Sequence, residues 1–119
     1  MEKRQVGTLG EKIALSLLWS KGYKILEKNF HTRFGEIDIV AQDGDTLVFV
    51  EVKTRHSRVF GLPEESVGRR KLRHLEKAGQ IFRLNRAGLP EAERIDVVSI
   101  ELAQNDQVIR KELIKNASQ

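Results

Sequence analysis

The chain is 119 residues long, with 39% hydrophobic and 32% charged residues, which fits one globular domain and leaves no room for two. The absence of cysteine excludes disulfides, thiolate zinc sites, iron–sulfur clusters and a cysteine nucleophile, and it suits a reducing compartment such as the cytoplasm. The net charge of +4 permits a polyanionic partner without establishing one. The longest apolar segment, residues 13–19, is much shorter than the ~20 residues that span a bilayer, so we expect no contact with a membrane interior.

Hydrophobic periodicity and turn residues predict a helix, three strands, a second helix and two further strands. In chain order these elements span residues 8–21, 23–30, 36–41, 47–53, 68–86, 94–102 and 107–113. Gly22 suits the left-handed position just after the first helix. Asp43, Gly44 and Asp45 predict a tight hairpin turn between the second and third strands.

The remaining segments connect these elements. Residues 55–62 are predicted to form a basic loop, and residues 63–67 a short turn before the second helix. The order of elements predicts an α/β fold in which helices pack against a mixed central sheet. We expect one domain over residues 1–114 and a polar tail at 115–119.

Glu11 falls within the apolar arc of the first helix at 100° per residue. The other members of that arc are Ala14, Leu15, Leu17, Leu18 and Trp19. The Glu11 carboxylate should therefore point towards the sheet, where it needs a cation, hydrogen bonds or a raised pKa. A simpler interpretation is that Glu11 complements the dipole near the start of the helix.

Acidic residues also lie on the two central strands. Alternation places Glu36, Asp38 and Val40 on one face of the second strand, with Ile37 and Ile39 on the other. The third strand is apolar on both faces, as expected of a covered central strand, yet Glu51 and Lys53 share the face of Phe49. A two- or four-residue hairpin loop would set Asp38 opposite Phe49 and diagonal to Glu51, with Glu36 directly opposite Glu51.

Carboxylates that meet in a half-buried sheet repel one another unless a cation lies between them. We therefore expect Asp38 and Glu51 to bind Mg²⁺ or Mn²⁺ together with a main-chain carbonyl near Val52. Lys53 would orient or activate the attacking water and stabilise charge on a phosphate, and Glu11 would position the metal or its water. The alternatives are acids that are solvated or paired with Lys53 and Arg55, or an ordinary core with incidental charges.

Together these motifs resemble a known group of enzymes. They are Gly10-Glu11 with Ala14, Gly35-Glu36-Ile37-Asp38, and the stretch from Phe49 through Glu51 and Lys53 to Arg55. The pattern is similar to the PD-(D/E)XK nuclease superfamily and, more closely, to small bacterial YraN-type proteins of uncharacterised function, which are similar to archaeal Holliday junction resolvases. The resemblance continues through Phe60-Gly61, Pro63, Val67, Lys71 and Ala78 to the strand at 94–98, and covers about residues 7–100.

The resemblance implies a restriction-endonuclease-like fold and metal-dependent hydrolysis of phosphodiester bonds in nucleic acid. It maps the motif acids onto Asp38 and Glu51, the motif lysine onto Lys53 and the helix acid onto Glu11. Ile37 stands where the superfamily name has proline, a replacement that related families tolerate. By analogy with junction resolvases, it also suggests a homodimer.

Basic residues surround the expected site. They are Arg55 and Arg58 in the loop after the third strand, and Arg69, Arg70, Lys71 and Arg73 at the start of the second helix. The opposite face of that helix is apolar, with Leu72, Leu75, Ala78, Gly79 and Phe82. The basic residues could hold a phosphate backbone, or they could form an ordinary solvated face. With no aromatic residue among the basic residues of the second helix, double-stranded or branched DNA is a better expected partner than single strands.

Other candidate residues carry weaker signals. His31, His56 and His74 lack the spacing of a zinc hydrolase and are expected to be surface residues. Asp96 is expected to pair with Arg94 rather than to join the site. The main functional hypothesis is therefore a metal-dependent endonuclease in the cytoplasm. The alternative is a non-catalytic nucleic-acid-binding adaptor or subunit that has a nuclease-like fold.

Overall fold

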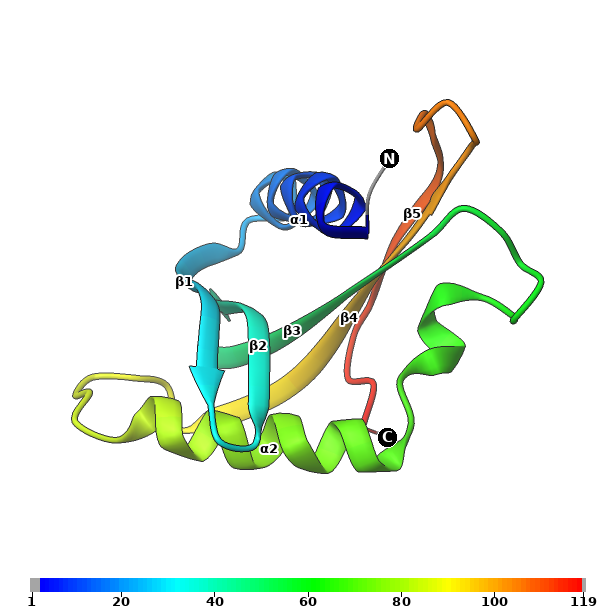
Figure 1. Cartoon of the computed structure of the whole chain (residues 1–119). Helices are drawn as coiled ribbons and strands as arrows, with labels where there is room; N and C mark the ends of the chain where they lie inside the picture. Colours follow the sequence, from blue (N-terminus) through cyan, green and yellow to red (C-terminus); the bar gives the residue numbers. More distant parts are fainter. Residues whose placement is uncertain (1–2, 119) are drawn as a thin grey trace.

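The computed structural model describes residues 3–118, with side chains from Val6 onward. The described residues form a five-stranded sheet with one α-helix packed on each face (Figure 1). The elements are α1 (Lys3–Ser20), β1 (Lys24–Thr32), β2 (Gly35–Asp43), β3 (Thr46–Arg55), the short 3₁₀ helix η1 (Pro63–Ser66), α2 (Arg69–Arg83), β4 (Ala92–Leu102) and β5 (Val108–Ile114). The predicted α/β fold and order of elements are confirmed, and the arrangement is compatible with a restriction-endonuclease-like fold.

The strands follow one another across the sheet in the order β1-β2-β3-β4-β5. Only β3 and β4 pair in parallel among the described strands, and the other neighbours are antiparallel. A parallel pair needs a crossover connection, which η1 and α2 supply. The crossover lays α2 along one face of the sheet, while α1 covers the opposite face (Figure 1).

Two hydrophobic cores lie on the two faces of the sheet. The α1 side includes Ala14, Leu18, Ile39, Val48, Val50, Val98 and Ile100. The α2 side includes Ile37, Val40, Leu47, Phe49, Leu75, Ala78 and Phe82. Alternate residues of β3 therefore enter opposite cores, as predicted for a central strand that is covered on both faces. Gly79 allows α2 to lie close to the sheet, because a Cβ there would meet the Phe49 ring at 2.3 Å.

Helix α1 departs from its prediction at two points. It begins at Lys3, well before the predicted start at residue 8. Trp19 was placed in its apolar arc, but its side chain is 77% exposed. The helix centres Ala14 and Leu18 on the sheet, and Trp19 lies about 100° further round the axis. Gly22 has a φ of +85°, which confirms the left-handed position after the helix.

The hairpin between β2 and β3 has a different register from the predicted one. Asp43 pairs with Thr46, so the turn consists of Gly44 and Asp45 alone. Arg94 Nη2 donates a hydrogen bond of 2.6 Å to Asp43 Oδ2, at the last strand residue before this turn. The predicted alignment of Asp38 with Phe49 is therefore wrong, because Val40 is the partner of Phe49.

The side-chain alternation of β2 is also interrupted. Ile37 and Ile39 were expected on the same face, but Ile37 packs with Val40 in the α2-side core and Ile39 enters the α1-side core. Pairing between β2 and β3 ends at Ile39 and Val50, whereas pairing between β3 and β4 continues to Arg55. The two central strands therefore part from each other at the position of Asp38.

The segment after β5 packs against the start of β4. The Asn116 N–H donates to Asp96 Oδ1 at 3.0 Å, and the Ala117 N–H donates to the Ile95 carbonyl at 2.7 Å. These residues belong to the predicted polar tail, whose last residue, Gln119, lies outside the described part of the chain. Within residues 3–118, neither helix has the length and apolar character needed to cross a membrane.

Candidate metal centre

A cleft of about 1070 Å³ opens where β2 and β3 part. Its walls come from the start of α1 and from strands β1, β2 and β3. The ionisable residues that line it are Glu11, His31, Glu36, Asp38, Lys53, Arg55 and His56. The structure thus places Glu11, Asp38 and Lys53, which the sequence predicted to act together, on the walls of the same cleft.

Glu51 lies in the sheet behind this cleft, and its side chain is nearly inaccessible. The residue is 3% exposed, on the face of β3 that α2 covers. Its Oε2 atom is 3.6 Å from Lys53 Nζ and 3.3 Å from Lys71 Nζ, which comes from α2. Its Oε1 atom is buried and has no hydrogen-bond partner among the described residues. A buried oxygen without a hydrogen-bond partner destabilises the fold, so the presence of a glutamate at position 51 calls for an explanation.

Asp38 is the second carboxylate of the centre. Its Oδ2 atom accepts a hydrogen bond of 2.8 Å from the Val52 N–H, at the point where β2 no longer pairs with β3. Burial and the nearby charge of Glu51 raise the pKa of Asp38 to about 7, against the lowering effect of that hydrogen bond. The negative charge of Glu51 therefore disfavours the ionised form of Asp38 when no cation lies between them.

These groups fit a hard divalent cation. A cation between Asp38 and Glu51 would give Glu51 Oε1 a partner and would favour ionised Asp38. Within residues 6–118, no group of three or more acidic or histidine side chains is placed to hold a metal. Two carboxylates match Mg²⁺, which is commonly bound by one or two carboxylates and keeps several waters. The main-chain carbonyl near Val52 is the additional donor that the sequence suggested.

Glu11 approaches the cleft from the side of α1. Its Oε1 atom accepts a hydrogen bond of 3.0 Å from Asn29 Nδ2 on β1. Burial raises the pKa of Glu36, and the neighbouring charges of Asp38 and Glu11 raise it further. Glu11 therefore belongs to the acidic wall of the cleft, and its predicted role in positioning the metal or its water stays a prediction.

Gly10 and Asn29 both help to position Glu11. Gly10 lets α1 lie against β3, since a Cβ there would fall 2.0 Å from Thr54 Oγ1. Asn29 has a φ of 54°, a left-handed conformation that asparagine tolerates better than most residues. Gly10 belongs to the sequence motif, whereas Asn29 lies outside it. Its only sequence signal is an asparagine within a strand pattern.

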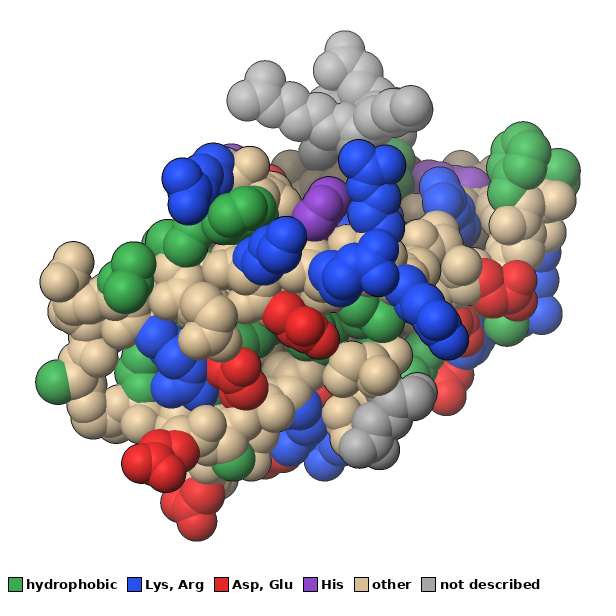
Figure 2. Space-filling view, turned by 90° about the horizontal axis from the view of Figure 1, so that it is seen from below, with side chains coloured by type: hydrophobic (Ala, Val, Ile, Leu, Met, Phe, Trp, Pro, Cys, Tyr) green, Lys and Arg blue, Asp and Glu red, His purple; other side chains and the backbone are tan. Residues whose placement is uncertain are grey.

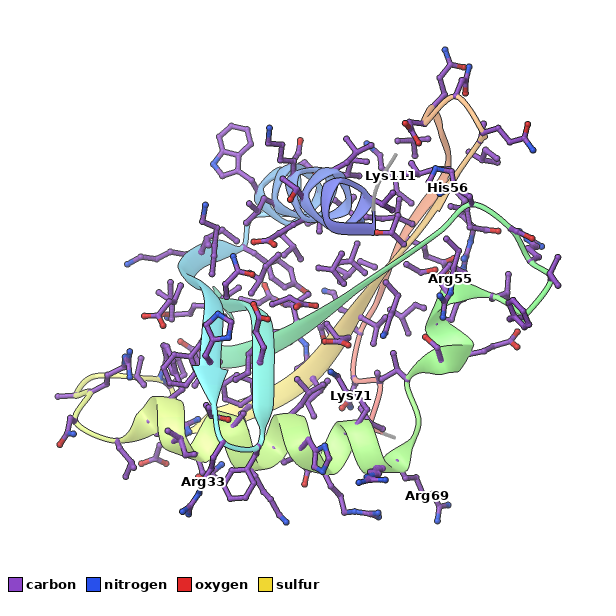
Figure 3. All side chains as sticks on the ribbon, viewed as in Figure 1. Arg33, Arg55, His56, Arg69, Lys71 and Lys111 are labelled. Carbon is purple, nitrogen blue, oxygen red and sulfur yellow. The ribbon has the colours of Figure 1, made fainter. Side chains whose placement is uncertain are left out.

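The predicted nucleic-acid-binding residues differ in whether an acidic side chain already pairs with them. Arg58 donates two hydrogen bonds to the Glu101 carboxylate, at 2.6 and 3.0 Å, so its charge is matched. Lys71 projects from α2 towards the sheet and Glu51, whereas Arg69 points away (Figure 3). Arg55 is exposed at the cleft.

The exposed basic residues of α2 form a surface of their own. Arg69, Arg70 and Arg73 are all exposed. Figure 2 looks onto the α2 side of the molecule and shows Lys and Arg side chains gathered there. The arrangement therefore separates lysines that contact the buried carboxylate from arginines that remain available to an anion.

The remaining candidates also find partners. Asp96 accepts hydrogen bonds from Arg94 Nε at 2.9 Å and from the Tyr23 hydroxyl at 2.8 Å, which confirms the predicted pairing with Arg94. The Asp96 side chain is buried on the α1 side of the sheet and does not line the cleft. His56 is exposed, as expected, and it lines the cleft with its Nε2 atom 2.6 Å from Asp106 Oδ1.

Comparison with known proteins places the chain in a family. The model of the uncharacterised protein family UPF0102 matches residues 10–100. A UPF0102 protein of Caldicellulosiruptor saccharolyticus is 42% identical, over 98% of this chain and 99% of its own length. A UPF0102 protein of Syntrophomonas wolfei is 50% identical, over 82% of this chain and 84% of its own. The chain therefore belongs to the uncharacterised protein family UPF0102.

Proposed function

We propose that this protein is a metal-dependent endonuclease of the PD-(D/E)XK type, which hydrolyses phosphodiester bonds in DNA. The observation that carries the proposal is the pair of carboxylates at the end of the β2–β3 ladder. One has a buried oxygen without a partner in the described residues, and the other has a pKa raised to about 7. Buried carboxylates that lack a partner or have a raised pKa are destabilising, and such groups are typical of functional sites.

Some residues of the centre would bind the metal, and others would act on the phosphate or the attacking water. Asp38, Glu51 and the carbonyl near Val52 would hold Mg²⁺ or Mn²⁺, which supplies Lewis-acid catalysis and lowers the pKa of water when bound. Lys53 lines the cleft 3.6 Å from Glu51 and would stabilise the charge that develops on the phosphate. Glu11, held by Asn29, would orient the attacking water from the side of α1.

Lys71 approaches Glu51, which suggests a role other than the phosphate contact expected from the sequence. Its Nζ atom is 3.3 Å from the same Glu51 oxygen that Lys53 approaches. Both ammonium groups approach Oε2, so Oε1 is left for the cation. We therefore assign Lys71 to the positioning of Glu51 rather than to direct contact with the DNA backbone.

The proposed DNA surface runs from the cleft to α2. Arg55 at the cleft and the exposed Arg69, Arg70 and Arg73 can contact phosphates, which suits double-stranded or branched DNA. Arg58 contributes less, because Glu101 matches its charge. Reversing the three α2 arginines to glutamate should weaken DNA binding and flatten its salt dependence. An unchanged salt slope would remove α2 from the interface.

Cleavage of a panel of duplex, forked and four-way DNA with Mg²⁺ or Mn²⁺ tests the activity. We expect cleavage by the wild type and its loss in Glu51→Gln and Lys53→Met. Lys111→Met is the matched control, because Lys111 is exposed on β5, outside the cleft. Cleavage that survives Glu51→Gln would refute the proposed centre. Tight binding without cleavage in either metal would instead support a non-catalytic adaptor.

A further inference from the structure

The loop between β3 and η1 presents two adjacent apolar side chains to solvent. Val59 is 80% exposed and Phe60 is 91% exposed. Single exposed hydrophobic residues are common on protein surfaces and need no explanation. An adjacent pair at a loop tip is informative when the backbone holds it outward, because a loosely held loop could fold the pair against the domain.

The backbone of this tip is fixed on both sides. The Gly61 N–H donates to the Arg58 carbonyl at 2.9 Å, which places Val59 and Phe60 in the centre of a tight turn. The bidentate pair of Arg58 with Glu101 anchors the turn to β4. Gly61 has a φ of 93°, which favours glycine over residues with side chains. The exposure of the pair therefore comes from the bracing of the turn.

The tip also lies close to the candidate metal centre along the chain. His56, four residues before Phe60, lines the cleft and is held by Asp106. Because each residue spans at most about 3.6 Å, the Cα atoms of His56 and Phe60 lie within about 14 Å of each other. The loop extends outward beyond the end of β3 (Figure 1). A DNA molecule bound at the cleft would therefore have the tip within reach.

We propose that Phe60, supported by Val59, contacts an unstacked base at a fork or branch in DNA. This inference rests on the proposed function and names the substrate class of the same site. The bases of an uninterrupted duplex are stacked on both faces, so a phenyl ring reaches them only at the cost of unstacking. A branch point already offers an open base face, on which an aromatic ring can stack whatever the sequence.

A tryptophan reporter at the tip tests this contact directly. The chain has one tryptophan, Trp19, so the double variant Trp19→Phe, Phe60→Trp carries its only indole at the loop tip. We expect forked or four-way DNA, added in EDTA, to quench this fluorescence, and an intact duplex of equal length to leave it unchanged. The wild type is the matched control, because Trp19 is 77% exposed on α1. An equal response to both DNA forms would overturn the inference.

Binding measurements provide the second test. Phe60→Ala should weaken binding to forked DNA by about five- to a hundredfold, the effect of losing one aromatic–base stack, and leave duplex binding unchanged. Leu84→Ala is the control, because Leu84 is 62% exposed at the far end of α2. An unchanged ratio of the two affinities in Phe60→Ala would refute the contact.

The two proposals fail in different ways, because both measurements are made without divalent metal. Quenching by forked DNA without cleavage in any metal would uphold the contact and refute the nuclease. Cleavage without quenching would do the reverse. The absence of all DNA binding would refute both.

Discussion

Replacing Asp38 with asparagine should change how the stability of the metal-free protein depends on pH. The pKa of Asp38 is raised from 3.8 to about 7 in the folded chain. Between these values the folded state keeps a proton that the unfolded state has released. The free energy of unfolding therefore falls as the pH rises through this window, by about 1.4 kcal/mol per pH unit at most.

Across the whole window the loss amounts to as much as about 4 kcal/mol. The asparagine side chain in the Asp38→Asn variant does not titrate, and its oxygen can still accept the hydrogen bond from the Val52 N–H. The stability of Asp38→Asn relative to wild type should therefore increase from pH 4 to pH 8. Shifted acids that Asp38 does not influence, such as Glu64 with a pKa lowered to about 2 by Arg110, are present in both proteins and cancel in the difference.

Urea unfolding of both proteins in EDTA at pH 4, 6 and 8 measures this difference. A difference in unfolding free energy that stays constant with pH would refute the assignment of a raised pKa to Asp38. Repeating the series with Mn²⁺ in place of EDTA distinguishes the effect of the Asp38 pKa on stability from the effect of metal binding. At pH 8, Mn²⁺ should stabilise the wild type, by about 2.7 kcal/mol at a concentration of 100 times its Kd, and leave Asp38→Asn unchanged.

Two further substitutions test the packing around the sheet. Gly79→Ala should destabilise the protein by roughly 1–3 kcal/mol, because the new Cβ would overlap the Phe49 ring, whereas Gly7→Ala in α1 meets nothing within 4 Å and should be neutral or stabilising. Equal unfolding midpoints for the two variants would contradict this account. Tyr23→Phe should cost roughly 1–3 kcal/mol in urea unfolding, because buried Asp96 loses a hydrogen-bond donor, and a smaller loss would show that other donors suffice.

The fold was predictable because its signals are local. The continuous apolar run of residues 47–50 identified a strand covered on both faces, and the two cores confirm it. The turn was harder, because Asp43-Gly44-Asp45 contains more than one position for a tight turn. In the observed turn, the carboxylate of Asp43 is bound by Arg94, which lies 51 residues away in the sequence. A local pattern carries no information about that contact.

The candidate site was predictable to a similar extent. The two-residue period of β3 placed Glu51 and Lys53 on one face, and the structure gives them a separation of 3.6 Å. The approach of Lys71 to Glu51 depends on how α2 packs against the sheet, so helix periodicity alone assigned this lysine to the basic surface. Likewise, the matched charge of Arg58 depends on Glu101, 43 residues away.

The parting of β2 from β3 affects how rigid the cleft is. From Glu51 to Arg55, β3 has lost its ladder with β2 but keeps the one with β4. Glu51, Lys53 and Arg55 thus stand on a backbone that pairs with one neighbouring strand only. Such a scaffold is preorganised and needs no lid to assemble it. Amide protons bonded to β4 should accordingly exchange slowly with solvent deuterium even before any ligand binds.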